Sequence, residues 1–214
     1  MTDPLPEMSA EESSARVIRA LLDYRSIWTT HDLVELSQAP SVDVRRIIDD
    51  LQAESLIERR RGGIIAVPDW SLLLSRWAAN SPVLTTSQLS RWKAPKDLFD
   101  RLATSPLKYA LTSEHAAAFW TATPTASNAV IYTPDAQSAA TAWHLTPTPK
   151  GDVVLAEPPL DVVYLRRRST PTGLRLAAPA QVLADLLSTS NGRPTPVSTN
   201  LTNWMHAHLF EWRY

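Results

Sequence analysis

The stretch from Thr29 to Val67 reads TTHDLVELSQAPSVDVRRIIDDLQAESLIERRRGGIIAV. Its first half predicts two helices, one capped by Thr30 and one capped by Ser41, joined by a turn at residues 38–40. The apolar residues of the second helix recur at the spacing of one helix face, which predicts that they are buried; they are Val44, Ile47, Ile48 and Leu51. This arrangement is typical of a helix-turn-helix.

The second half of the stretch has the pattern of a β-hairpin. Residues 56–60 are expected to form a strand, the Gly-Gly pair at 62–63 a turn, and residues 64–67 the returning strand. A preceding helix, capped by Ser13 or Ser14, is predicted from apolar residues at helical spacing, namely Val17, Ile18, Leu21 and Leu22. Three helices followed by a hairpin predict a winged helix-turn-helix, so the stretch predicts duplex DNA binding.

The polar face of the helix that follows Ser41 carries the residues that we expect to meet DNA. In a helix-turn-helix, the N-terminal residues of this helix contact base edges in the major groove. Arg45 and Arg46 can pair with guanine or phosphate, and Ser41 with phosphate. The expected contact residues here are Thr30, Ser41, Asp43, Arg45 and Arg46. The alternative is a solvated surface on which the arginines pair with Asp49 and Asp50, each pair being worth about 0.3–0.5 kcal/mol.

Two runs of three arginines are further candidates. Arg59, Arg60 and Arg61 directly precede the Gly-Gly turn, where they suit contact with phosphate or the minor groove. The alternative for this run is a solubilising edge that prevents strand pairing. The second run, Arg166, Arg167 and Arg168, follows a predicted strand. It is expected either to form a basic patch that touches DNA or an acidic partner, or to be a solvated loop.

The composition limits the classes of protein that remain. The 214 residues contain no Cys, which excludes disulfides and thiolate metal sites. No apolar run approaches the roughly 20 residues of a membrane span, and the acidic N-terminus lacks the features of a signal peptide, so we expect a cytoplasmic protein. Residues 1–79 hold 9 Arg and 13 Asp or Glu, a net charge of −4. DNA binding by this part must therefore depend on clustered arginines and not on bulk charge.

The whole chain is predicted to be of the α+β class, with an N-terminal winged helix-turn-helix domain followed by a mixed α/β domain with a small sheet. We expect a disordered tail at 1–12, the winged domain with a bridging helix at 13–79, a connecting region at 80–94 and the second domain at 95–214. The second domain should alternate strands near 107–111, 129–132, 153–156, 162–165 and 174–177 with helices near 114–120, 135–144, 179–187 and from 198.

Catalytic, cofactor and metal motifs are missing from the sequence. His206 and His208 lie two residues apart and so point to different helix faces, and no phosphate-binding glycine loop occurs. Asp161 is expected to be a turn residue and Asp185 a helix-surface residue. Thr112-Ser113 is expected to cap a helix, the alternative being an anion site. We therefore predict no enzyme activity, no cofactor and no metal. Five tryptophans on apolar helix faces are expected in the core: Trp70, Trp77, Trp120, Trp143 and Trp204.

Several short motifs, in order, resemble the AbiEi family of antitoxins from type IV toxin–antitoxin systems. They are VPDWSLLLSRWA after the hairpin, YALTSEHAAA at 109–118, LDVVYL at 160–165, GLRLAAPAQVLADLL at 173–187, NGR at 191–193 and NWM at 203–205. The resemblance covers about residues 13–213. Relatives usually carry Thr-Gly where this chain has Thr112-Ser113, so a turn that favours glycine must be accommodated differently.

The resemblance implies a DNA-binding repressor of its own operon. It also implies a second domain that counters a nucleotidyltransferase-like toxin without being an enzyme. Our own hypothesis allows this domain antitoxin action, further DNA contact or homodimer formation. Two alternatives stay open: a stand-alone regulator or protein-docking module without a toxin partner, and a nucleotidyltransferase-like or nuclease-like enzyme. The missing clustered acids argue against the enzyme.

Overall fold

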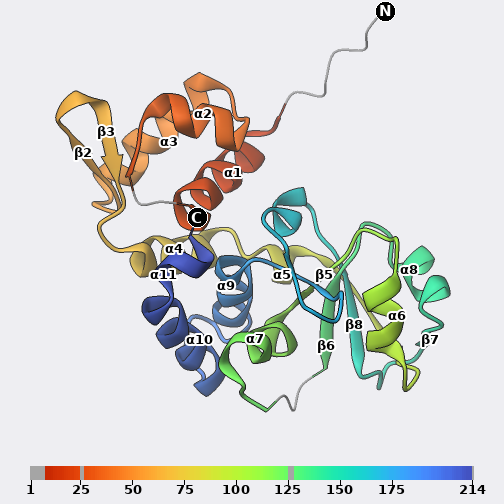
Figure 1. Ribbon diagram of the computed structural model, residues 1–214. Coiled ribbons are helices and arrows are strands. Elements are labelled where there is room, and N and C mark those ends of the chain that lie inside the picture. The colour runs from red at the N-terminus through yellow and green to blue at the C-terminus, as the bar shows by residue number, and fades with distance from the viewer. Residues whose placement is uncertain (1–7, 25–26, 125–127, 214) are drawn as a thin grey trace, which may run out of the picture. The chain divides into compact units, whose positions relative to one another are not determined.

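The computed structural model describes residues 8–24, 27–124 and 128–213, which form two compact units (Figure 1). Unit 1 contains the chain up to Trp77 together with Arg213, and unit 2 runs from Ala78 to Trp212. Each unit contains helices and one sheet, so the protein is of the mixed α+β class.

Unit 1 is built on three helices, α1 (Ala10–Asp23), α2 (Thr30–Ser37) and α3 (Ser41–Ala53), which pack on one another. The apolar stripe predicted on α3 is fully buried, with each member at most 3% exposed: Val44, Ile47, Ile48 and Leu51. The stripe predicted on α1 is also buried. Periodic apolar residues therefore determine the core of this unit.

A small antiparallel sheet follows the helices. Strands β2 (Glu58–Arg60) and β3 (Ile64–Ala66) form a hairpin, and β1 (Ile27–Trp28) pairs with the other edge of β3. The hairpin tip is the short 3₁₀ turn η1 (Arg61–Gly63), where both glycines have positive φ, 78° and 76°. Glycine adopts this backbone without steric cost, which explains the Gly-Gly pair.

The predicted start of α1 is wrong. The helix begins at Ala10, because the Ser9 hydroxyl caps it by accepting a hydrogen bond from the Glu12 N–H at 3.1 Å. Ser13 and Ser14, the two expected caps, both lie inside the helix, and Ser13 is buried. The expected tail at 1–12 is therefore helical at its end, and residues 1–7 lie outside the described part.

The predicted caps of α2 and α3 are each one residue too late. Thr29, not Thr30, caps α2 through a capping box, in which its hydroxyl and the Asp32 carboxylate each accept a backbone N–H of the other residue. Pro40 occupies the N-cap of α3, since its carbonyl accepts the first helical hydrogen bond, from Val44. Ser41 is thus the first helical residue and forms no cap.

Helix α4 (Trp70–Asn80) carries the chain out of unit 1. The Asp69 carboxylate accepts the Ser71 N–H at 2.8 Å and so caps the helix. Trp70 and Trp77 are buried, at 5% and 0% exposed, so their predicted core positions are confirmed.

Unit 1 also includes Arg213, from far along the chain. Its guanidinium donates to the Leu21 and Tyr24 carbonyl oxygens, each at 2.8 Å, at the end of α1. The side chain is 9% exposed. Burial lowers the pKa of Arg213 to about 10, and neighbouring Asp23 partly offsets this effect. The Arg213 guanidinium is therefore still charged at neutral pH. It binds carbonyl oxygens at the C-terminal end of α1, where the helix itself supplies no backbone N–H to donate to them.

Unit 2 contains a mixed sheet, which has seven strands within the described residues and is larger than the small sheet expected. The strand order is β7-β4-β8-β6-β5-β10-β9. Neighbours pair antiparallel except β6 with β8 and β5 with β10. The strands are β4 (Gln88–Lys93), β5 (Ala110–Thr112), β6 (Ala129–Tyr132), β7 (Thr146–Pro147), β8 (Val153–Glu157), β9 (Arg168–Ser169) and β10 (Arg175–Leu176).

The expected connecting region at 80–94 is part of this sheet. It contains the short helix α5 (Val83–Thr86) and the strand β4, which pairs with β8 along its length. The strand escaped prediction because its sequence, QLSRWK, buries only Trp92. The turn after β7 lies so close to β4 that a Cβ on Gly151 would come within 2.1 Å of the Trp92 carbonyl oxygen.

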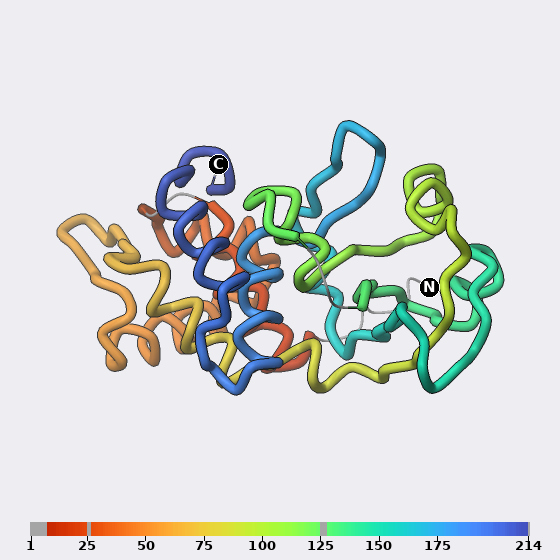
Figure 2. Tube along the Cα trace, turned by 90° about the horizontal axis from the view of Figure 1, so that it is seen from below, coloured from red at the N-terminus to blue at the C-terminus, as the bar shows by residue number. Residues whose placement is uncertain are grey.

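Unit 2 contains further helices, which pack on the sheet or on other helices. They are α6 (Leu98–Thr104), α7 (Ser113–Thr121), α8 (Ala136–Ala142), α9 (Pro179–Thr189), α10 (Pro196–Ala207) and α11 (Leu209–Trp212). Helices α9 and α10 lie side by side in two views and both contact α7 (Figures 1 and 2). Trp143 is buried as predicted, whereas Trp120 and Trp204 are half-buried and pack on each other, with ring centroids 5.7 Å apart. No described helix has the length and apolar composition needed to cross a membrane.

Residues 162–165 do not form the predicted strand. They fall mostly in a 3₁₀ turn, η2 (Asp161–Tyr164), in which Val162, Val163 and Tyr164 are all buried. A short continuous apolar run has no periodicity that separates a buried strand from a buried turn. Asp161 begins this turn, as expected.

A buried carboxylate joins the sheet of unit 2 to α9. Asp185 is 1% exposed, so its expected position on the helix surface is wrong. It accepts hydrogen bonds from Thr112 on β5, from the Tyr132 hydroxyl at 2.9 Å and from the Gln181 amide at 2.8 Å. Burial, followed by the Asp185 charge, raises the pKa of Tyr132 well above its usual value, so the phenol keeps the proton that it donates.

Ser113 shows how the chain accommodates the turn that favours glycine in relatives. Thr112 occupies the N-cap of α7 but forms no side-chain cap, because its hydroxyl donates to Asp185. Ser113 begins the helix with φ of +57° and is 8% exposed. This left-handed backbone is disfavoured for residues with a Cβ.

Replacing Ser113 with glycine should therefore raise the free energy of unfolding by about 0.5–1 kcal/mol, because glycine adopts positive φ without the Cβ clash. Urea denaturation followed by circular dichroism measures the change. Ser188→Gly, at a helical position in α9, is the matched control and should lower stability. A loss of stability in Ser113→Gly would contradict the prediction.

Candidate nucleic-acid interface

The exposed face of α3 carries the two arginines singled out from the sequence. Arg45 and Arg46 are exposed, while the apolar stripe on the opposite side of the helix is buried. Arg46 lies 3.9 Å from both Asp43 and Asp50, at the outer limit of an ion pair. Within the described residues, the Arg45 side chain has no hydrogen bond or ion pair. It is thus available for an outside acceptor.

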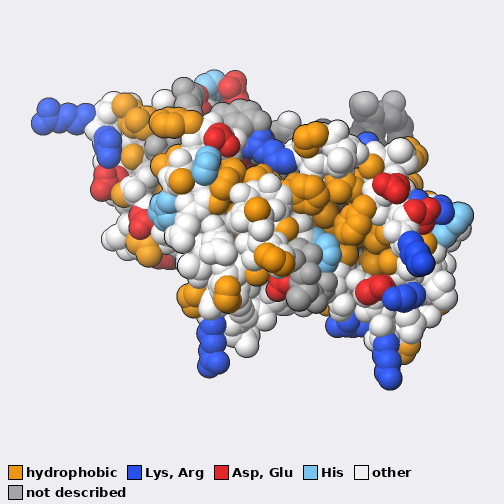
Figure 3. Space-filling view, turned by 60° about the horizontal axis from the view of Figure 1, so that its bottom comes forward, with side chains coloured by type: hydrophobic (Ala, Val, Ile, Leu, Met, Phe, Trp, Pro, Cys, Tyr) orange, Lys and Arg blue, Asp and Glu red, His pale blue; other side chains and the backbone are white. Residues whose placement is uncertain are grey.

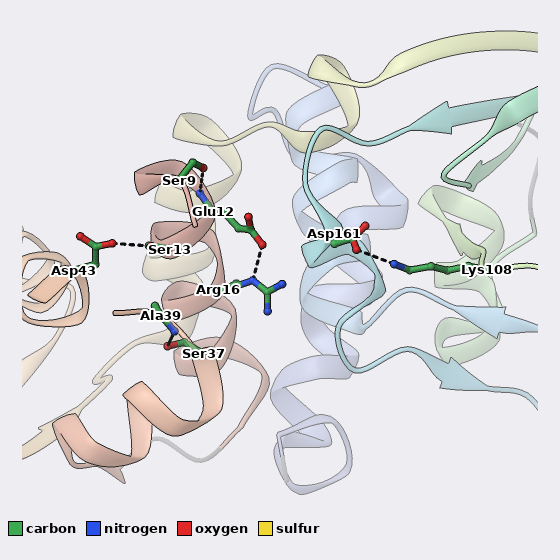
Figure 4. Close-up of polar contacts among 9 residues, drawn as sticks. All are labelled: Ser9, Glu12, Ser13, Arg16, Ser37, Ala39, Asp43, Lys108 and Asp161. Carbon is green, nitrogen blue, oxygen red and sulfur yellow. Dashed lines mark hydrogen bonds and ion pairs between the residues drawn. The ribbon is translucent and has the colours of Figure 1, made fainter. Parts of the chain in front are cut away.

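Asp43 has a role inside unit 1. Its carboxylate accepts a hydrogen bond from the Ser13 hydroxyl at 2.8 Å, which links α3 to α1 (Figure 4). The Asp43 side chain is 22% exposed, less than half the exposure of Arg46. These contacts indicate that Asp43 holds α3 on α1. The sequence pattern does not reveal this contact, because Ser13 lies on a different helix.

The two helix-start residues differ in exposure. Thr30, the first residue of α2, is half-buried, and Ser41, the first residue of α3, is exposed. The free N–H groups at the start of α3 lie beside Ser41. Both residues stay candidate contacts, with Ser41 the more accessible one.

The three arginines of the hairpin have different partners. Arg59 forms an ion pair with Asp49, which ties β2 to α3. Arg60 lies 3.3 Å from Glu58 on the same strand, and both are more than half exposed. Arg61 begins the tip turn and is exposed, without a hydrogen bond or ion pair to any described residue. Of these three arginines, Arg61 is therefore the most available to an external anion.

The remaining described arginines of unit 1 are already engaged. Arg16 pairs with Glu12 at 2.9 Å, Arg19 with Asp23, and Arg76 with Glu54 at 2.7 Å. The hydrogen bond from Arg76 lowers the pKa of Glu54. On the face in Figure 3, Lys and Arg side chains stand singly or beside acids and do not form one continuous basic surface. On this face, an anion would therefore meet individual side chains and not a continuous basic surface.

The second arginine run is partly engaged within unit 2. Arg166, Arg167 and Arg168 are all half-buried. Arg167 donates to the Tyr109 carbonyl at 2.8 Å and lies over the Tyr164 ring, and burial lowers its pKa. Arg168 donates to the Trp212 carbonyl at 3.0 Å. Arg167 and Arg168 thus each contact a backbone carbonyl of unit 2. Whether the run also touches DNA or an acidic partner stays a prediction.

The described residues contain no group of three or more His, Asp or Glu side chains that could hold a metal ion. The carboxylates discussed above are instead engaged with single arginines, hydroxyls or amides.

Comparison with known proteins points to one class. A family model described as "Transcriptional regulator, AbiEi antitoxin, Type IV TA system" matches residues 67–204. Comparison with curated protein sequences gave no match. Among solved structures, the chain is similar to an IclR-family transcriptional regulator from Rhodococcus sp., with 14% identity over 98% of this chain and 73% of that chain and a TM-score of 0.28. This structural likeness is too low to carry an argument.

The family match spans well over half of the chain and defines a transcriptional regulator. The chain belongs to the AbiEi antitoxin family of type IV toxin–antitoxin systems. The match begins at Val67 and so lies mainly in unit 2. The DNA-binding role of α3 and the hairpin must be argued from unit 1 itself.

Proposed function

We propose that unit 1 is a winged helix-turn-helix domain that binds duplex DNA, with α3 as the recognition helix and the β2–β3 hairpin as the wing. One observation carries the proposal: within the described part of unit 1, Arg45 on α3 and Arg61 at the hairpin tip are the arginines without a hydrogen bond or ion pair. Unpaired guanidinium groups on a helix and its adjoining hairpin suit a ligand with regularly spaced anions.

The ion pair between Arg59 and Asp49 supports this assignment. It joins β2 to α3, so the hairpin is held relative to the recognition helix before DNA arrives. Such preorganisation reduces the ordering cost of binding. Arg59 would then position the wing, Arg61 would contact phosphate or the minor groove, and Arg45 would contact a base edge or phosphate.

Membership in the AbiEi family extends the proposal to regulation. The protein would repress its own operon, and unit 2, which carries most of the family match, would counter a nucleotidyltransferase-like toxin. The toxin role predicts a toxin gene beside the gene for this protein. A gene neighbourhood without one would favour a stand-alone regulator.

Replacing Arg45 and Arg61 together with alanine should weaken binding to the upstream region of the protein's own gene by at least about tenfold. The salt dependence should also flatten, because each lost phosphate contact reduces the slope of log K against log salt by roughly 0.9. Fluorescence anisotropy with a labelled duplex, measured over a salt series, gives both quantities.

The matched control is Arg16→Ala, which removes one arginine of unit 1 that is paired on α1. This variant should keep the salt slope of the wild type. An unchanged slope in the Arg45/Arg61 double variant would remove both residues from the interface. If the intact protein binds no duplex even at low salt, unit 1 is a protein-docking module instead.

A further inference from the structure

A groove of about 510 Å³ lies within unit 2 and has no role in the proposed DNA binding. Its volume falls in the range typical of sites for small ligands, roughly 300–1,000 Å³. Its walls come from α5, the start of α7 and the end of α9, and its floor is one face of the sheet. All of its lining residues belong to the described part of the chain.

The floor is aliphatic. Val154 on β8 and Val130 on β6 are directly paired neighbours, and Leu89 on β4 lies on the same face. Leu186 of α9 adds to the wall. Leu89, the second residue of β4, is 55% exposed. Val154 and Leu186 are only 8% and 6% exposed, so the apolar surface open to a ligand is chiefly Leu89 with part of Val130. A ligand with aliphatic groups would cover it.

Two opposite charges line opposite sides of this floor. Arg91 on β4 is paired across the sheet with Val154, and Val154 with Val130. Thr112, at the end of β5, is paired with Val130, and Glu114 follows two residues later. Three interstrand spacings, about 14 Å, separate β4 from β5. Within the described residues, neither the Arg91 guanidinium nor the Glu114 carboxylate forms a hydrogen bond or ion pair.

The wall between these charges is held rigidly. Thr112 precedes Ser113, which lines the groove, and Asp185 precedes Leu186, which also lines it. The buried hydrogen bond between Thr112 and Asp185 thus fixes two adjacent wall residues. Ser113 keeps its left-handed backbone at the rim. Strained backbone is often retained beside ligand sites.

We propose that this groove binds a short zwitterionic peptide with aliphatic side chains, its carboxylate at Arg91 and its ammonium group at Glu114. A single amino acid is too short to reach both charged groups. An extended chain spans about 3.3–3.6 Å per residue, so three residues cover about 10 Å, and the two side chains close the remaining gap. A fatty acid would place aliphatic carbons beside the half-buried Glu114 carboxylate without supplying a cation, which is unfavourable.

Isothermal titration calorimetry of the full chain with Leu-Ala-Leu, without DNA, tests the proposal independently of DNA binding. N-acetyl-Leu-Ala-Leu and Leu-Ala-Leu amide each lose one terminal charge and should bind about tenfold more weakly. Arg91→Gln should bind the free peptide and the amide equally, and Glu114→Gln should bind the free and acetylated peptides equally.

Lys108→Gln is the matched control, because Lys108 pairs with Asp161 and does not line the groove. It should bind Leu-Ala-Leu like the wild type. The proposal is overturned if folded wild-type protein gives no binding heat at millimolar peptide. It is equally overturned if Arg91→Gln and Glu114→Gln still discriminate against the blocked peptides as the wild type does.

Discussion

Replacing Asp185 with alanine is expected to lower the free energy of unfolding by about 3–5 kcal/mol. The change removes the acceptor shared by Thr112, Tyr132 and Gln181 in a region that water does not reach. A buried donor without an acceptor costs about 1–3 kcal/mol, and three are created at once. Urea denaturation followed by far-ultraviolet circular dichroism measures the loss.

Two further variants provide a comparison for the loss of stability in Asp185→Ala. Tyr132→Phe removes one donor and leaves the carboxylate two others, so it should cost about 1 kcal/mol. Asp161→Ala breaks an exposed pair with Lys108, in which Asp161 is 62% exposed, and should change stability by no more than about 0.5 kcal/mol. Equal effects of Asp185→Ala and Asp161→Ala would refute the idea that the buried carboxylate organises unit 2.

The second large effect is expected in unit 1. Arg213→Ala removes two hydrogen bonds to the end of α1 and one positive neighbour of buried Asp23. We expect the free energy of local unfolding of α1 to fall by about 2–4 kcal/mol. Amide hydrogen exchange of α1 should therefore accelerate by about 30-fold or more, because each 1.4 kcal/mol corresponds to a factor of ten.

Mass spectrometry of peptides from α1 and from α9 separates this effect from general destabilisation. Exchange in α9, which belongs to unit 2, should stay close to the wild-type rate. Arg213→Lys keeps the positive charge but loses the planar guanidinium that donates both hydrogen bonds. It should therefore give an intermediate exchange rate in α1. Unchanged exchange of α1 in Arg213→Ala would show that the contact does not stabilise the helix.

The helices and hairpin of unit 1 could be predicted from the sequence because their signals are local. Val44 and Leu51 fall on one face by spacing alone, and the Gly-Gly pair indicates a hairpin turn. The caps were each displaced by one residue or more. Ser9, Thr29 and Pro40 could all begin a helix, and only the backbone geometry distinguishes them from their neighbours.

Unit 2 was harder to predict because its decisive features depend on distant partners. Strand β4 has one strongly buried side chain, Trp92, and is recognisable as a strand only through its pairing with β8. Asp185 reads as a surface acid on α9, since the residues that surround it come from β5 and β6. No pattern within α9 indicates those donors.

In the candidate site, too, the sequence does not show which charged side chains are already paired with distant residues. The sequence identified the arginines of α3 and the hairpin but treated the members of each run alike. The structure distinguishes Arg61 from Arg59, which Asp49 already binds, and shows that Arg167 binds a backbone carbonyl. Whether an arginine is free depends on tertiary neighbours, which a run of identical letters does not encode.

The place of Arg213 in unit 1 has a consequence for biosynthesis. The ribosome makes α1, α3 and the hairpin first, yet the side chain that completes unit 1 emerges only after the whole of unit 2 has been made. At about 5–20 residues per second, this delay is on the order of 10 s. Prematurely terminated chains would contain Arg45 and Arg61 but lack this contact. On the proposed function, chains that contain Arg213 should therefore bind DNA better than such fragments.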